Sequence, residues 1–332
     1  MLVARAGWPA LAGIVLLIAI PLMVTDRYVL YVLNISMIFA ILAIGQNIIT
    51  GWCGMLTLGH AAFFGVGAYT SGLLAVDHGW PFLACFAAAG LAAGLAGALL
   101  SLPCLRVRSD FLSLITIAFA QMFFVVVNNW TELTRGPMGL PRIPRMEVFG
   151  WTARTEAEIF WVIGGVLAIV MFAVHRLVSG PIGRAWEAVR DDENAARALG
   201  INVTHAKVQA FTIGCVLAGF AGSLYAHTLR IVAPEMFFLE ESLIIMQMAI
   251  LGGLASLPGS LLGAALMVGI PEALRSGNEW LITLRPGIGG ALLLAMMIWR
   301  PQGLLGRLRD APPFLLALSA ALRGLFVRRS RR

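Results

Sequence analysis

The stretch GWCGMLTLGHAAFFGVGAYTSG, from Gly51 to Gly72, breaks the long apolar runs on either side of it. It holds six glycines, one histidine and two threonines. A glycine inside a helix costs about 1 kcal/mol relative to alanine, so a membrane helix needs a reason to hold several. Small-xxx-small pairs, such as Ala61 with Gly65 and Ala68 with Gly72, let helices pack closely. Alternatively, a broken helix frees backbone groups that can line a substrate path.

The sequence around this stretch has the composition of an integral membrane protein. Of its 332 residues, 59% are hydrophobic and 12% are charged, and the mean hydropathy is +0.86. Soluble domains are about 45–50% apolar and about 25% charged. The net charge of +7 comes from arginines, with Lys207 as the only lysine. In a membrane protein such residues mark the cytoplasmic side, so we expect a lipid bilayer and no nucleic acid as partner.

Ten apolar segments are long enough, or nearly so, to cross roughly 30 Å of hydrocarbon as helices. Strands of a membrane barrel would instead be about ten residues long with alternating polarity. The sequence therefore predicts an all-α polytopic integral membrane protein with about eight to ten transmembrane helices, because residues 51–60 could form a re-entrant segment. The segments are 8–24, 28–49, 61–77, 82–102, 111–129, 159–177, 208–229, 240–255, 259–274 and 284–299.

The positions of the basic residues give the topology. With the N-terminus in the cytoplasm, sixteen of the 24 basic residues fall inside, as cytoplasmic loops require. This predicts a transmembrane domain over residues 1–309, with a periplasmic loop at 130–158, a cytoplasmic loop at 178–207 and both termini cytoplasmic. The apolar stretch within the basic segment 310–332 is too short to span the membrane, so this segment is expected to be a cytoplasmic tail.

Several chemical signatures are missing from the sequence. The nucleotide-binding P-loop needs lysine followed by serine or threonine, whereas Lys207 precedes Val208. Neither HExxH nor GxSxG occurs, and the four cysteines form no CxxC pair. We therefore expect no enzyme, no metal site and no cofactor bound by this chain. The 17 carboxylates lie in loops or near helix ends, which leaves His60 and His227 as weak candidates for proton coupling.

A second glycine-rich interruption, LGGLASLPGSLLG at 251–263, lies in the other half of the chain. Paired helix breaks in the two halves of a transporter indicate a substrate path where they meet. Polar side chains beside the breaks could face this path or bond neighbouring helices, and for His60 a structural hydrogen bond is favoured. The candidate path residues are Gln46, Asn47, Gly54, Thr57, Gly59, His60, Gly252 and Gly253.

The inner loop, SGPIGRAWEAVRDDENAARALGINVTHAK, is predicted to be helical. Asp192 is placed to cap a second short helix, which Gly200 ends. A compact, charged helical loop suits the docking of a partner protein, and it equally suits a solvated connector. Four apolar residues recur at helical spacing in its first half, namely Ile182, Ala185, Trp186 and Val189.

Seven stretches of the chain together resemble one family. In order from about residue 28 to residue 306 they read LTLGHAAFFGVGAYTSGLL, RVRSDFLSLITIAFAQ, NNWTELTRGPMGL, GRAWEAVRDDENAARALGINVTHAKVQAF, AGFAGSLYAH, ILGGLASLPGSLLGAAL and WRPQGLLG. This combination is similar to the LivM-type permease subunits of bacterial branched-chain amino acid ABC importers. Urea and short-amide permeases are similar as well, so the substrate stays open. A self-sufficient carrier or channel is the competing class.

The resemblance implies an ABC importer permease in the bacterial inner membrane. It implies a sibling LivH-type permease subunit, two cytoplasmic ATPase subunits that hydrolyse ATP, and a periplasmic substrate-binding protein as partners. Asn194-Ala195-Ala196-xxx-Gly200 resembles the EAA-xxx-G signature of importer permeases, with asparagine in place of glutamate. Met55 stands where relatives often have glutamine, so no role of that glutamine transfers. The implied ATPase-coupling residues are Arg184, Glu187, Ala188, Asp191, Asp192, Asn194, Ala195, Ala196 and Gly200.

Overall fold

The computed structural model describes residues 26–104, 109–148, 150–275, 287, 289–291, 294, 296, 298 and 303–306. Long helices dominate this part of the chain, as an all-α polytopic membrane protein requires. They are α2 (Arg27–Asn47), α3 (His60–Asp77), α4 (Phe82–Cys104), α5 (Ser109–Asn129), α7 (Glu156–Val178), α10 (Val203–Leu229), α11 (Leu239–Gly252) and α12 (Leu257–Arg275). The short helices are η2 (Ile48–Trp52), α6 (Thr131–Thr134), η3 (Gly136–Met138), α8 (Pro181–Asp191), α9 (Glu193–Ala198) and η4 (Pro234–Phe237).

These helices lie where eight of the ten predicted apolar segments lie. Five are long and apolar enough to cross a membrane: Arg27–Trp52, Phe82–Ser101, Leu112–Asn129, Glu156–Val178 and Val203–Leu229. Helix α12 contributes a shorter apolar helix, Leu257–Glu272. Among the described helices that flank the two glycine breaks, α2 is therefore a candidate span, whereas α3, α11 and α12 do not meet the combined criterion of length and hydropathy. The predicted segment 8–24, most of 284–299, both termini and the tail 310–332 lie outside the described residues.

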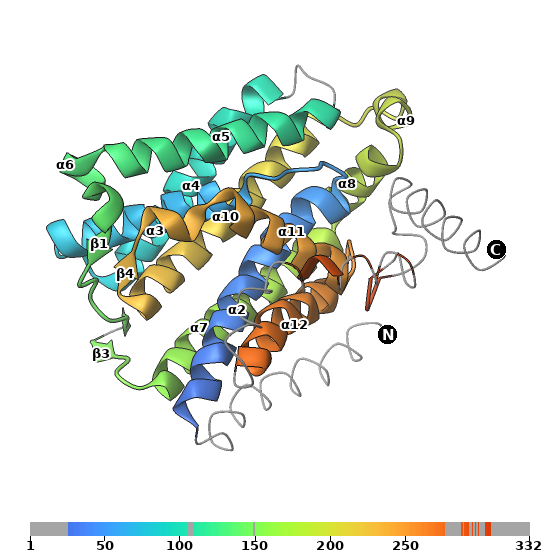
Figure 1. The fold of residues 1–332 in the computed structure, drawn as a ribbon. Coiled ribbons are helices and arrows are strands. Elements are labelled where there is room, and N and C mark those ends of the chain that lie inside the picture. Colours follow the sequence, from blue (N-terminus) through green and yellow to red (C-terminus); the bar gives the residue numbers. More distant parts are fainter. Residues whose placement is uncertain are drawn as a thin grey trace, which may run out of the picture.

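Helix α10 forms the centre of the bundle. It packs along α4, α3 and α2, while α2 also packs along α12 and α7 (Figure 1). The contact between α3 and α10 is backbone to backbone, because a Cβ on Gly67 would overlap the Cα and carbonyl of Gly219. A Cβ on Gly222 would likewise overlap the Phe64 carbonyl. The glycines of α3 therefore do serve close packing.

The glycines that make this contact differ from those that the small-xxx-small spacing singled out. Gly65 faces the rings of Phe123 and Phe237 instead of a neighbouring backbone. Gly72 faces the side chain of Ile143 in an outer loop. Gly65 and Gly72 therefore make room for side chains of neighbouring elements, whereas the close approach of the α3 and α10 backbones uses Gly67 and Gly222.

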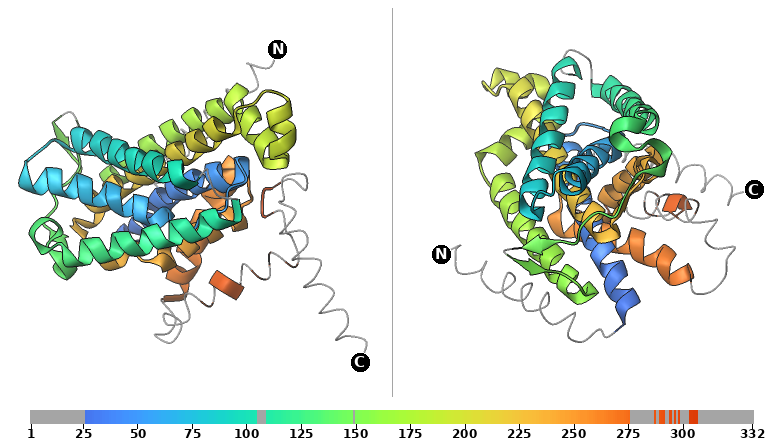
Figure 2. Two further views of the ribbon diagram at one scale, coloured as in Figure 1. Left: turned by 90° about the horizontal axis from the view of Figure 1, so that it is seen from above. Right: turned by 90° about the vertical axis from the view of Figure 1, so that its left-hand side faces the viewer.

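The two long loops lie at opposite ends of the bundle. One end carries α6 and four two-residue strands, β1 (Leu140–Pro141), β2 (Glu147–Val148), β3 (Trp151–Thr152) and β4 (Ile231–Val232), and the other carries α8 and α9 (Figures 1 and 2). The strands pair antiparallel, with Leu140 opposite Val232 and Glu147 opposite Thr152. Pairing of β1 with β4 joins the loop at 130–158 to the turn after α10.

Candidate functional site

The first helix break follows α2, where the helix widens into the π-helical turn η2 and then ends. Cys53 N still donates to the Ile48 carbonyl at 3.2 Å, after which residues 53–59 run without regular helix. Gly54 adopts φ +76°, a left-handed conformation that favours glycine. Helix α3 then restarts at His60. The predicted glycine break is therefore present, and its π-helical form is of a kind often found at functional sites.

The second break separates α11 from α12. Helix α11 ends at Gly252, and Gly253 turns the chain at φ +120°. Ala255 adopts φ +58°, which is uncommon for a residue with a Cβ. The close approach of Gly252 to Gly259 leaves no room for side chains, because a Cβ on Gly252 would overlap the Gly259 carbonyl. Both predicted interruptions are thus confirmed as breaks of the helical backbone.

One buried side chain, that of Asn47, ties the two breaks together. Its Nδ2 donates to the Gly253 carbonyl at 3.1 Å and to Ser260 Oγ at 2.7 Å. The same atom lies 3.3 Å from the Ser256 carbonyl. Its Oδ1 accepts from Ala255 N at 2.9 Å. Asn47 therefore satisfies backbone groups that the second break would otherwise leave unpaired.

Gln46 performs a similar task for the first break. Its Nε2 donates to the Thr57 carbonyl at 3.0 Å and lies 3.0 Å from Thr50 Oγ1. It also contacts Met246 Sδ of α11 at 3.2 Å. Gln46, Asn47 and Thr57 are all buried, so these predicted path residues hold the breaks in place in this conformation.

The start of α3 is clamped between two other helices. Leu58 N donates to Thr116 Oγ1 of α5 at 3.1 Å, and Ala61 N donates to Ser242 Oγ of α11 at 3.0 Å. His60, between them, is buried, and its Nε2 has no hydrogen-bond partner among the described residues. The expected bond from His60 to a freed carbonyl is therefore not formed by this atom.

His227, the second weak candidate for proton coupling, has a complete set of structural partners. Its Nε2 lies 3.0 Å from Ser71 Oγ, and its Nδ1 lies 2.8 Å from the Pro144 carbonyl. The Phe82 ring packs edge-on against the imidazole with centroids 5.0 Å apart. These contacts join α10 to α3, to α4 and to the loop at 130–158, which is a structural role.

The inner loop forms the predicted pair of helices. Pro181 begins α8 at the position that suits proline, and Trp186 and Val189 are buried on one face. Asp192 caps α9 by accepting from Asn194 N at 2.7 Å and from Ala195 N at 3.1 Å. Gly200 ends the pair at φ +83°.

Most of the predicted coupling residues lie on the open surface of this helix pair. Ala188 is half-buried, and Ala196 is only 1% exposed, because it packs inside the helix pair. Ala196 is therefore unsuited to direct docking. Sequence reasoning missed Leu199, which is 79% exposed at the tip of α9. The exposed members are Arg184, Glu187, Asp191, Asp192, Asn194, Ala195 and Gly200.

Sequence reasoning also missed Arg190, which joins α8 to the first break. Its Nη1 donates to the Gly51 carbonyl at 2.9 Å. Arg190 lies one helical turn after Trp186, so it borders the buried face of α8. The position of Arg190 on α8 could be predicted from the sequence. Its partner, Gly51, lies 139 residues earlier in the chain and could not.

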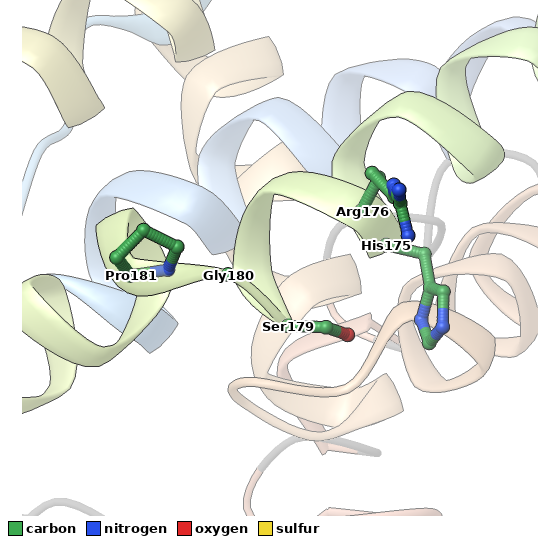
Figure 3. Close-up of a pocket in the computed structure, with 5 residues that line it drawn as sticks. All are labelled: His175, Arg176, Ser179, Gly180 and Pro181. Carbon is green, nitrogen blue, oxygen red and sulfur yellow. The ribbon is translucent and has the colours of Figure 1, made fainter. Parts of the chain in front are cut away.

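A pocket lies where α7 meets α8, lined by His175, Arg176, Ser179, Gly180 and Pro181 (Figure 3). Figure 3 shows that these side chains come from the end of α7 and the start of α8. All five residues differ from the predicted site residues. The pocket therefore belongs to the junction of the two helices and not to the breaks.

Comparison with known proteins gives a consistent set of relatives. The model of the family described as "Branched-chain amino acid transport system / permease component" matches residues 28–299. The high-affinity branched-chain amino acid transport system permease protein LivM of Escherichia coli K12 is 38% identical over 317 residues, which cover 89% of this chain and 73% of LivM. The LivH permease protein of the same strain is 28% identical over 289 residues, covering 81% of this chain and 91% of LivH. No solved structure matches.

Proposed function

The chain belongs to the permease component family of branched-chain amino acid transport systems, and we propose that it is a membrane subunit of an ATP-driven ABC importer for leucine, isoleucine or valine. The observation that carries the mechanism is the contact between α8 and the first helix break. Helix α8 belongs to the surface loop that a partner protein could move. At this contact it touches the end of η2, which could line the substrate path. The substrate class follows from the names of the LivM and LivH relatives.

The proposed division of labour assigns ATP hydrolysis to other subunits. The chain has no P-loop, so two cytoplasmic ATPase subunits would bind and hydrolyse ATP. A LivH-type sibling would form the other half of the path, and a periplasmic binding protein would deliver the amino acid. This arrangement would place the chain in the bacterial inner membrane with both termini cytoplasmic. Helices α8 and α9 would then face the ATPases, and the β1–β4 end would face the periplasm.

The proposed path runs beside the two breaks. An amino acid zwitterion with an apolar side chain suits walls that are mostly apolar and that offer backbone groups and few charges. Of the predicted path residues, all except Gly54 are buried in this conformation, so substrate would pass only after the breaks move apart. Selectivity would reside in the delivery protein, since the path needs only transient contacts.

Uptake of labelled leucine at low external concentration tests this function. A strain that lacks this gene and other branched-chain importers is expected to lose uptake, and the gene on a plasmid is expected to restore it. Energy depletion should abolish the restored uptake. Unchanged leucine uptake in the deletion strain would contradict the substrate assignment, and the same strain would then be assayed with labelled urea and acetamide. Uptake by the purified chain alone, without ATP, would instead support a carrier or channel.

Replacing Leu199 with aspartate should disrupt the proposed docking of α9 on an ATPase subunit. Leu199 is 79% exposed, so the chain itself loses little packing, while a charge would be buried in the partner's groove. We expect uptake to fall by roughly tenfold or more, because an unpaired buried charge weakens an interface by several kcal/mol. The measurement is leucine uptake together with co-purification of the ATPases.

The conservative Leu199→Met variant is the matched control and should retain uptake. Equal membrane levels of both variants would show that insertion is unaffected. Full uptake and full ATPase co-purification by Leu199→Asp would contradict a docking role for the tip of α9.

A further inference from the structure

We propose that Arg190 is the positioning residue that transmits movement of α8 to both helix breaks. The inference rests on the proposed function, because it assumes that α8 and α9 receive movement from ATPase subunits. It adds a residue and a route that the family resemblance does not supply.

The first step of the route is the contact between Arg190 and the end of η2. The last carbonyls of a helix lack partners within the helix and carry partial negative charge. Residues 44–52 include no lysine or arginine that could neutralise this end. The guanidinium of Arg190 supplies the missing charge from another helix, donating to the Gly51 carbonyl at 2.9 Å. A charged hydrogen bond of this kind is among the stronger contacts available.

The backbone of α8 also rests directly on the coil after the break. A Cβ on Gly54 would lie 2.8 Å from Arg190 Cγ and 3.2 Å from Arg190 Cα. The side chain of Arg190 is only 13% exposed, which shows that it is enclosed at this contact. Its 3.5 Å pair with Asp191, which is 68% exposed, is a weak surface interaction that does not pull it away. Movement of α8 therefore acts on residues 51–54 by direct contact with Arg190, both its side chain and its backbone.

The second step leads from Gly51 to the other break. A Cβ on Gly51 would overlap Asn47 Oδ1 and lie 2.5 Å from Ala255 N, so the three groups are in close contact. Asn47 in turn holds Gly253 and Ser260 through its Nδ2. A contiguous chain of packed and hydrogen-bonded groups thus connects α8 with both breaks, as transmission between distant sites requires.

The helix pair is fixed to the bundle at its far side as well. Glu193 of α9 forms an ion pair with Lys207 of α10, and Arg197 lies 3.8 Å from Glu193. Trp186 anchors α8 in the interior. Asp192 joins the two helices, because its N donates to the Ala188 carbonyl of α8 at 3.1 Å and its carboxylate caps α9, so displacement of the exposed end of α9 reaches Arg190.

The test uses the complete transporter in proteoliposomes, with its ATPase subunits and binding protein, and measures leucine uptake per ATP hydrolysed. Arg190→Met should lower this ratio by roughly tenfold while ATP hydrolysis continues, which is within the usual range of coupling between sites. Arg190→Lys should retain most of the uptake, because an ammonium group can still donate to one carbonyl. Arg176→Met, an exposed arginine of α7 away from the breaks, is the matched control and should behave as wild type.

A second measurement keeps the inference testable if Arg190→Met fails to assemble. Amide hydrogen exchange of the wild-type complex is compared with and without trapped nucleotide. Exchange at residues 51–59 and 253–256 should change on trapping in the wild type, and to a similar extent in Arg190→Lys, which keeps a donor for the Gly51 carbonyl. An unchanged uptake-to-ATP ratio in Arg190→Met, or no exchange change at these residues in the wild type, would overturn the inference. A wild-type complex that shows the exchange change but does not take up leucine would overturn the proposed substrate and leave the role of Arg190 intact.

Discussion

Replacing Gly67 with leucine is expected to prevent stable folding of the helix bundle. The position faces the backbone of Gly219, and even a Cβ would overlap its Cα and carbonyl. Neither backbone can move without separating α3 from α10, which is one of the two most extensive helix contacts of the described bundle. Overpacking a well-filled core costs about 1–3 kcal/mol, and a clash with backbone lies at or above the upper end of that range. Thermal unfolding of the purified protein in detergent should show a large decrease in Tm or no folded protein.

Gly165→Leu is the matched control for this substitution. Gly165 lies in the middle of α7, is exposed, and has nothing within 4 Å of an added Cβ. Leucine there should leave Tm unchanged or raise it slightly, because leucine favours a helix over glycine by somewhat less than about 1 kcal/mol. Similar Tm values for Gly67→Leu and Gly165→Leu would contradict the backbone contact between α3 and α10.

Asn47→Ala is expected to have the second large effect. The substitution leaves the Gly253 carbonyl, Ala255 N and Ser260 Oγ without their partner in a buried site. Hydrogen bonds inside membrane proteins contribute about 0.6 kcal/mol each on average, and unsatisfied buried groups cost more. The loss of several together should destabilise the protein by about 2–3 kcal/mol and collapse the second break. Both Tm and leucine uptake should fall.

Asn129, on the surface of the bundle, provides the matched control for Asn47→Ala. Asn129 is exposed, and its Nδ2 bonds only the Val125 carbonyl of its own helix at 2.8 Å among the contacts described. Asn129→Ala should change the free energy of unfolding by less than about 0.5 kcal/mol. If Asn47→Ala unfolds at the same temperature as Asn129→Ala, then Asn47 does not hold the breaks together.

The positions of the helices followed from the sequence because hydrocarbon thickness dictates the length of each apolar segment. The two breaks followed from glycine clusters, and the cap at Asp192 from its place before a short helical pattern. The π-helical form of residues 48–52 was not predicted from the sequence, and Gly51 within it packs closely against Asn47 and against Ala255, which is far away in the chain. Backbone conformation at such a site is set by tertiary contacts and not by local composition.

Contacts between distant parts of the chain could not be predicted from the sequence. The path role of Asn47 stays a prediction, and its four neighbours in residues 253–260 also make it a tie between helices. Ala196 was predicted as one of the coupling residues, and because it is only 1% exposed it could contribute only through the packing of the helix pair. Arg190 went unnoticed because its partner is a backbone carbonyl, which carries no signature in the sequence.

The length of helix α10 has a consequence for how the bundle can move. It runs 27 residues without a proline, so at 1.5 Å per residue it is about 40 Å long. Lys207 near its start is paired with α9, and His227 near its end is bonded to the Pro144 carbonyl at the opposite end of the bundle. If α10 tilts as a rigid body by about 5° around its middle, its two ends move about 2 Å in opposite directions. A single tilt of α10 would then open the substrate path at one face of the membrane and close it at the other.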